Sequence, residues 1–141
     1  MAELDDWFKK QAEPLGIFDL ASKWAEALKV IGAGNGAGLL AAGAALSSFA
    51  KSPAMLPSIK IGGTFFFIGV MSFALSFALI QLAIFSYDEM LHAIRTKSAD
   101  AAKKNKTTSS SAMIAANWLA ILSALAFFGG LTFGLIAFLK A

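Results

Sequence analysis

The sequence predicts an all-α integral membrane protein, a bundle of three transmembrane helices preceded by an amphipathic interfacial segment. Hydrophobic residues make up 57% of its 141 residues and charged residues only 15%. Soluble domains are about 45–50% apolar and about 25% charged. Three apolar stretches each exceed the roughly 20 residues that a helix needs to cross a bilayer. A formal net charge of +3, scattered along the chain, argues against nucleic acid as a partner.

Residues 1–27 are expected to form an amphipathic cytoplasmic segment at the membrane surface. Apolar residues recur at helical spacing on both sides of Pro14 and Gly16, which predicts two short helices, the second running into the first span. Trp7 and Trp24 suit the interface, because an indole combines a large apolar body with one polar N–H. Packing of this segment against the protein's own cytoplasmic loop is the alternative.

The transmembrane domain, residues 28–139, is expected to contain spans at 28–50, 61–86 and 112–139. Pro53 and Pro57 stop the helices on both sides of a short connection, so the first two spans form a hairpin. The second and third spans contain no charged residue. Trp118 is an interfacial anchor near the start of the third span. Residues 87–111 are expected to be a cytoplasmic loop. Its first part, to Ile94, continues the second helix, and the rest is a solvated, lysine- and serine-rich segment.

Small residues occupy one side of each span, which predicts close helix contacts in the membrane. In the second span they fall at intervals of seven, and in the first they form two overlapping GxxxG pairs on adjacent faces, so that helix can be gripped from two sides. The predicted packing residues are Gly32, Gly34, Gly36 and Gly38 in the first span, Gly62, Gly69, Ser76 and Ala83 in the second, and Gly130 and Gly134 in the third.

The distribution of basic residues predicts the orientation. The N-terminal segment and the connection between the second and third spans together carry nine Lys and Arg, against three at the other ends of the spans. By the positive-inside rule the N-terminus is cytoplasmic and the C-terminus is outside. The expected location is a bacterial inner membrane.

The glycine run beginning at Gly32 has an enzyme-like interpretation that the rest of the chain does not support. Gly32, Gly34 and Ala37 match the dinucleotide-binding pattern GxGxxA after a short apolar run. That fold also needs an acidic residue about 20 positions later, to hold the ribose. No Asp or Glu occurs between Glu26 and Asp88, so nucleotide binding is not expected.

Few side chains are candidates for chemistry. The polar residues in or near the spans are the amides Asn35, Gln81 and Asn117, for which a hydrogen bond across a helix pair is favoured over substrate binding. Asp88, Glu89 and His92 are close together, but the single histidine and the absence of cysteine leave a metal site short of ligands. We expect no catalytic residue, no metal and no cofactor.

The same glycine run resembles the first helix of the proton-ring subunit of rotary ATP synthases, over about ten residues. That family carries a proton-binding carboxylate in its second helix, where this chain has only Gln81. The resemblance therefore implies close packing, not proton transport.

Taken whole, the chain resembles the small inner-membrane proteins of proteobacteria in which an Asn-Gly-Gly-Ala tract opens a span. Here the tract runs from Asn35 to Ala41, with Ala37 in place of the second glycine. This resemblance brings no activity with it. Three-span phage holins are a second likeness, but they have the opposite orientation and a strongly basic tail.

The expected function is that of a non-catalytic assembly or accessory subunit, partnered by the lipid bilayer and by copies of itself or a larger membrane complex. The motivation is that three spans with small-residue faces offer more contact surface than one bundle consumes. The alternative is a pore-forming, holin-like or defence protein in which Asn35, Gln81, Ser72 and Ser76 surround a lumen. A solute carrier is the weakest interpretation, since the chain lacks inverted repeats and intramembrane charge.

Overall fold

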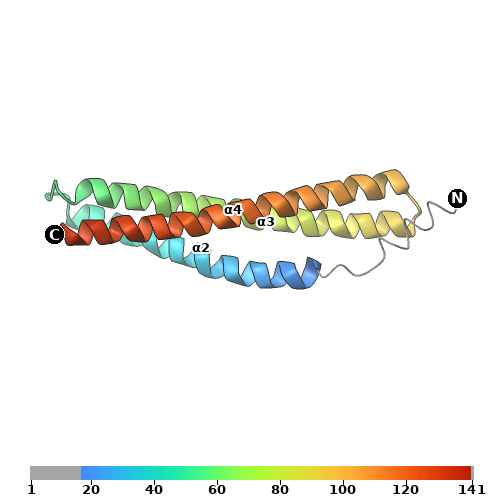
Figure 1. Cartoon of the computed structure of the whole chain (residues 1–141), viewed down its shortest axis with the longest axis horizontal. Coiled ribbons are helices and arrows are strands. Elements are labelled where there is room, and N and C mark those ends of the chain that lie inside the picture. Colours follow the sequence, from blue (N-terminus) through green and yellow to red (C-terminus); the bar gives the residue numbers. More distant parts are fainter. Residues whose placement is uncertain (1–16, 141) are drawn as a thin grey trace.

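The computed structural model describes residues 17–140, which form three helices joined by two short connections. They are α2 (Ile17–Ser48), α3 (Leu56–Arg95) and α4 (Ala99–Leu139). Figure 1 shows α3 and α4 side by side along the length of the molecule, with α2 crossing them obliquely over one half. Each helix is long and apolar enough to cross a membrane. The predicted all-α fold with three membrane-spanning helices is confirmed.

The N-terminal part of the chain is only partly described. Residues 17–27 belong to α2, which therefore begins well before the first predicted span. Trp7 lies outside the described residues. Trp24 lies in α2, and the structure describes its backbone only. The predicted connection near Pro53 and Pro57 is present as the turn between Ser48 and Leu56, and Pro57 lies in the first turn of α3, where its missing N–H costs no hydrogen bond.

The prediction of a solvated loop from Arg95 to Ser111 was wrong. Helix α3 continues to Arg95, and α4 already begins at Ala99, so only Thr96, Lys97 and Ser98 connect the helices. Lys97 has a φ of 56°, the left-handed conformation that reverses a chain in few residues. The helices have 40 and 41 residues, about 60 Å each, twice the roughly 30 Å of a bilayer core. Residues 87–106 therefore form a helical hairpin beyond the apolar spans, here called the stalk.

The stalk is held by a short apolar stripe that composition alone does not reveal. Tyr87, Met90 and Ala93 of α3 pack with Ala102 of α4, which is completely buried. A single small residue on α4 is enough to form this contact, because α3 supplies the larger side chains. The lysines around Ala102 remain exposed, and such residues are good helix formers.

Helices α3 and α4 meet along an antiparallel seam of small residues, which continues through the membrane-spanning part. Positions advance by seven on α3 while they retreat by seven on α4. Three serine hydroxyls bridge the seam, each donating to a backbone carbonyl of the other helix. Ser123 donates to Gly69 at 2.8 Å, Ser76 to Ala116 at 2.7 Å, and Ser109 to Ala83 at 2.8 Å. At the far end, Gly62 faces Gly130 so closely that a Cβ on Gly62 would lie 3.3 Å from the Gly130 carbonyl oxygen.

The helical stalk predicts efficient cross-linking between its two arms. The chain has no cysteine, so cysteines placed at Met90 and Ala102 are the only thiols available. We expect the double variant to form a disulfide under mild oxidation, because both positions are in one buried cluster. The matched control pairs Met90→Cys with Lys104→Cys, an exposed position on another face of α4. Equal cross-linking of the two pairs, read from a gel shift, would indicate a flexible loop.

Candidate functional site

The three helices meet at Asn35, which is completely buried. Its amide NH2 group donates one proton to the Ile31 carbonyl at 3.1 Å in its own turn and shares the other between the Ser123 carbonyl and hydroxyl, at 3.1 and 3.2 Å on α4. The Ser123 hydroxyl in turn donates a hydrogen bond to the Gly69 carbonyl on α3. One amide and one hydroxyl therefore tie all three helices at a single level of the bundle.

The amide oxygen of Asn35 faces Gly69 and depends on that residue being glycine. Within the described residues the oxygen accepts no hydrogen bond from an N–H or O–H group. A Cβ built on Gly69 would overlap this amide, so the glycine Cα–H group points at the oxygen. Such Cα–H···O contacts recur at close helix interfaces and contribute about 0.5–1 kcal/mol each. Gly69 thus gives the amide both space and a weak donor.

The glycines of α2 receive phenylalanine rings rather than a neighbouring backbone. A Cβ on Gly32 would lie 2.7 Å from the Phe73 ring, and one on Gly34 would lie 2.8 Å from the Phe127 ring. Gly38 faces Phe66 in the same way, within contact distance. These rings come from both α3 and α4, so α2 is held from two sides. Gly36 has nothing within 4 Å of its Cβ position and faces away from the bundle.

The other predicted residues lie apart from this junction. Gln81 is exposed on α3 and Asn117 is exposed on α4. The side chain of Trp118 is 67% exposed, on the outside of the bundle. Gly130 is buried against Phe66, whereas Gly134 is exposed and has nothing within 4 Å of its Cβ position. Of the predicted pore-lining set, Ser72 and Ser76 are buried inside the bundle with Asn35, while Gln81 is outside it. The four side chains therefore do not share a surface.

The charged groups of α3 and α4 lie toward the two ends of the hairpin that these helices form. Asp88, Glu89 and His92 are all exposed on the stalk. Among residues 17–140, no three His, Cys, Asp or Glu side chains come close enough together to hold a metal ion. The described residues therefore offer no cluster suited to metal chemistry.

Sequence reasoning missed Ser123 and Ser109, which supply two of the three hydroxyl bridges. Their signal was present, because Ser109, Ala116, Ser123 and Gly130 repeat at intervals of seven, as the small residues of the second span do. Matching the two repeats in antiparallel register would have paired them. The phenylalanines that pack against the glycines of α2 could not be identified from the sequence, because other phenylalanines of α3 and α4 face outward.

A second stripe of small residues faces outward on α2. Gly36 and Gly43 are seven residues apart, and apart from the neighbouring backbone of their own helix, no atom of the described residues lies within 4 Å of either Cβ position. Ala33, Ala37 and Ala44 are exposed on the same side. These residues, with Leu40, are called the outer face of α2. The seam residues Gly62, Gly69, Ser76 and Ala83 of α3 pack within the chain, whereas the outer face of α2 contacts no other described helix.

No protein-family model, curated protein or solved structure matches this chain.

Proposed function

We propose that this protein is a non-catalytic assembly or accessory subunit of a bacterial inner membrane, and that it contacts its partner, a second copy or a larger complex, through the outer face of α2. The observation that carries the proposal is the open space at Gly36 and Gly43, on a helix that already uses its other glycines to hold the bundle. In a membrane, helices associate where small residues let them approach closely. If large side chains such as Leu and Phe lined this face instead, they would pack equally well against lipid, and the face would not indicate a partner.

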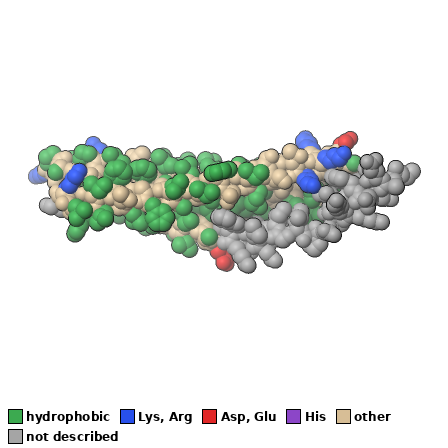
Figure 2. All heavy atoms as spheres, in the orientation of Figure 1, with side chains coloured by type: hydrophobic (Ala, Val, Ile, Leu, Met, Phe, Trp, Pro, Cys, Tyr) green, Lys and Arg blue, Asp and Glu red, His purple; other side chains and the backbone are tan. Residues whose placement is uncertain are grey.

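The stalk adds a second element to this proposal. Figure 2 shows lysine and arginine side chains gathered at the stalk end of the hairpin. By the positive-inside rule this end is cytoplasmic, as are residues 17–27 at the start of α2. A rigid hairpin beyond the bilayer gives a membrane subunit a fixed contact point for a soluble partner or for anionic headgroups.

The test is the assembled mass of the chain when the outer face is blocked. We expect the wild-type chain, extracted in mild detergent, to exceed the monomer mass or to carry a partner. Gly36→Leu with Gly43→Leu should release the monomer without unfolding it, because both positions are open. Ala74→Leu, an exposed substitution on α3, is the matched control and should leave assembly intact. A wild-type chain that is monomeric at every concentration and captures no partner from native membranes would refute the proposal.

The pore alternative has less support from the geometry. Three of its four proposed lumen side chains are buried within one copy, and Asn35 and Ser76 make hydrogen bonds between helices. Dye leakage from vesicles containing the purified chain remains the direct measurement, and we expect none.

A further inference from the structure

A groove opens between the three helices at the end opposite the stalk. It encloses about 310 Å³ and is lined almost entirely by apolar atoms. Its walls come from all three helices and are made mainly of glycine and alanine, among them Ala41, Ala42 and Ala45 of α2, Gly63 of α3, and Gly134 and Ala137 of α4. The small side chains at these positions keep the groove open.

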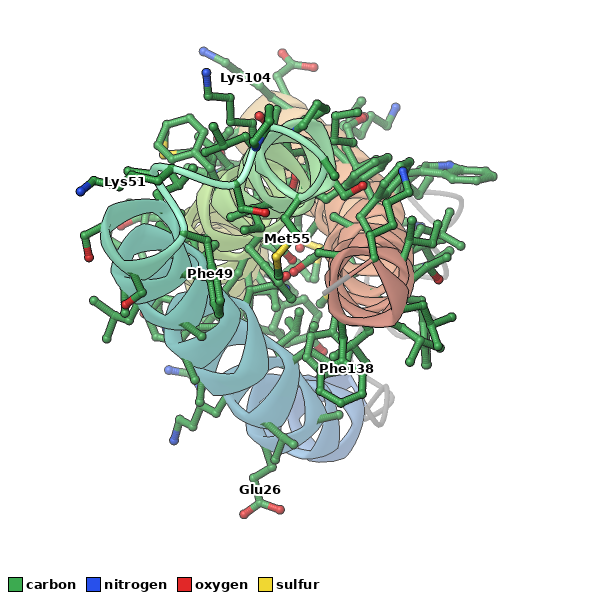
Figure 3. The ribbon with its side chains drawn as sticks, turned by 90° about the vertical axis from the view of Figure 1, so that its left-hand side faces the viewer. Glu26, Phe49, Lys51, Met55, Lys104 and Phe138 are labelled. Atoms are coloured by element: carbon green, nitrogen blue, oxygen red, sulfur yellow. The ribbon has the colours of Figure 1, made fainter. Side chains whose placement is uncertain are left out.

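The groove has a closed inner end and an open outer end. Phe66 closes the inner end, where its buried ring lies between Gly38 and Gly130. Figure 3 looks onto the outer end, with Phe49 and Phe138 at the rim and Met55 between the helices. From Met55 to Phe66 the groove follows α3 for about 16 Å, close to half of a bilayer core of roughly 30 Å. Its length is therefore that of one leaflet.

The outer end is positively charged. Lys51 and Lys140 each follow a rim phenylalanine by two positions, and Lys60 follows Ile59, which also lines the groove. All three lysines are exposed. No Asp or Glu occurs between Glu26 and Asp88 or after Asp100, so no side-chain carboxylate of these parts of the sequence neutralises the lysines. Figure 2 shows basic side chains at this end without an acidic one beside them.

The charge at the outer end selects between the possible occupants. A second copy in the same orientation would bring its own Lys51, Lys60 and Lys140 to the same level of the membrane, where like charges repel each other. An acyl chain is apolar like the lining of the groove, and it is the molecule that surrounds a transmembrane helix.

We propose that an anionic phospholipid occupies this groove, with one acyl chain between the helices and its phosphate at the outer end, which carries Lys51, Lys60 and Lys140. Unlike charges attract the phosphate to these lysines. The chain reaches Phe66 and fills space that the protein's own side chains leave empty. This inference depends on the membrane location of the helices and not on the assembly role proposed above.

The test uses the full-length chain in mild detergent with equal amounts of phosphatidylglycerol and phosphatidylcholine, followed by native mass spectrometry. We expect one phosphatidylglycerol to stay bound per protomer. Gly134→Leu fills the groove from an open position and should lower this retention at least tenfold. Ala78→Leu, exposed on α3 outside the groove, should leave it unchanged. Replacing the three rim lysines by Gln should abolish the preference between the two lipids.

Other outcomes overturn the proposal. Equal retention by Gly134→Leu and Ala78→Leu would mean that the bound lipid is annular, and equal binding of the two lipids by the wild-type chain would remove the headgroup site. Loss of a dimer in Gly134→Leu, without any change in lipid, would identify a second copy as the occupant. If Gly134→Leu lowers the melting temperature, a fluorescence experiment tests the proposal instead. In it the three natural tryptophans are replaced by Phe, and Phe138→Trp reports on lipid at the rim of the groove. Brominated phosphatidylglycerol should quench this tryptophan more strongly than brominated phosphatidylcholine, and equal quenching contradicts the proposal.

Discussion

Replacing Gly69 by Ala is expected to release α2 from the bundle at a cost of about 3 kcal/mol. The added methyl group would overlap the buried Asn35 amide, whose nitrogen is fixed by Ser123 on the opposite side. Overpacking costs about 1–3 kcal/mol, and losing the two hydrogen bonds from Asn35 to Ser123 adds about 1 kcal/mol.

The absence of cysteine makes this release measurable. Leu28 is only 1% exposed and packs against α3 and α4, so a Leu28→Cys thiol reacts with a maleimide only when α2 undocks. A change of 3 kcal/mol corresponds to about a hundredfold increase in labelling at equilibrium. Gly36→Ala is the control, because its Cβ meets nothing within 4 Å and alanine favours the helix. Similar labelling of the two variants would show that Gly69 is not at a closed contact.

Replacing Asn35 by Leu is the second large effect that we expect. The side chains are similar in size, so the change removes the amide's hydrogen bonds without emptying its site. Hydrogen bonds between membrane helices contribute about 0.6 kcal/mol on average and up to about 1.7 kcal/mol each. Losing both bonds to Ser123 should therefore cost about 1 kcal/mol and raise Leu28→Cys labelling by about fivefold.

Two natural controls separate this effect from a general change in polarity. Gln81 and Asn117 are also amides in the spans, but both are exposed. Gln81→Leu and Asn117→Leu should leave the labelling rate unchanged. An equally strong effect of either control would show that amide removal acts through insertion into the membrane and not through the junction.

The fold class and the small-residue seam were accessible from the sequence because both depend on repeating patterns. Apolar stretches longer than a bilayer define spans, and the repeat at Gly62, Gly69, Ser76 and Ala83 marks a contact face. The partner of that face was not accessible. The repeat is equally compatible with another copy of the chain, and only the structure places it against Ser123, Ala116 and Ser109 of α4.

The stalk was missed because its stability comes from pairing and not from composition. The segment around Ala102 has too few apolar residues to predict a core, and its lysines and serines are typical of a loop. Its helix is stabilised by Tyr87 and Met90 on the other arm. The role of Asn35 was expected in kind, as a hydrogen bond across a helix pair, but the third helix at the same junction required coordinates.

The distance in sequence between Asn35 and its partner has a consequence for biosynthesis. The two residues are 88 positions apart, so α2 is synthesised long before Ser123 exists. At about 5–20 residues per second, this interval is about 4–18 s. Throughout it, a polar amide in the middle of a new transmembrane segment has no partner on α4. Until the last helix arrives, the amide keeps only its hydrogen bond to the Ile31 carbonyl within α2, so the three-helix junction closes only after α4 has been inserted.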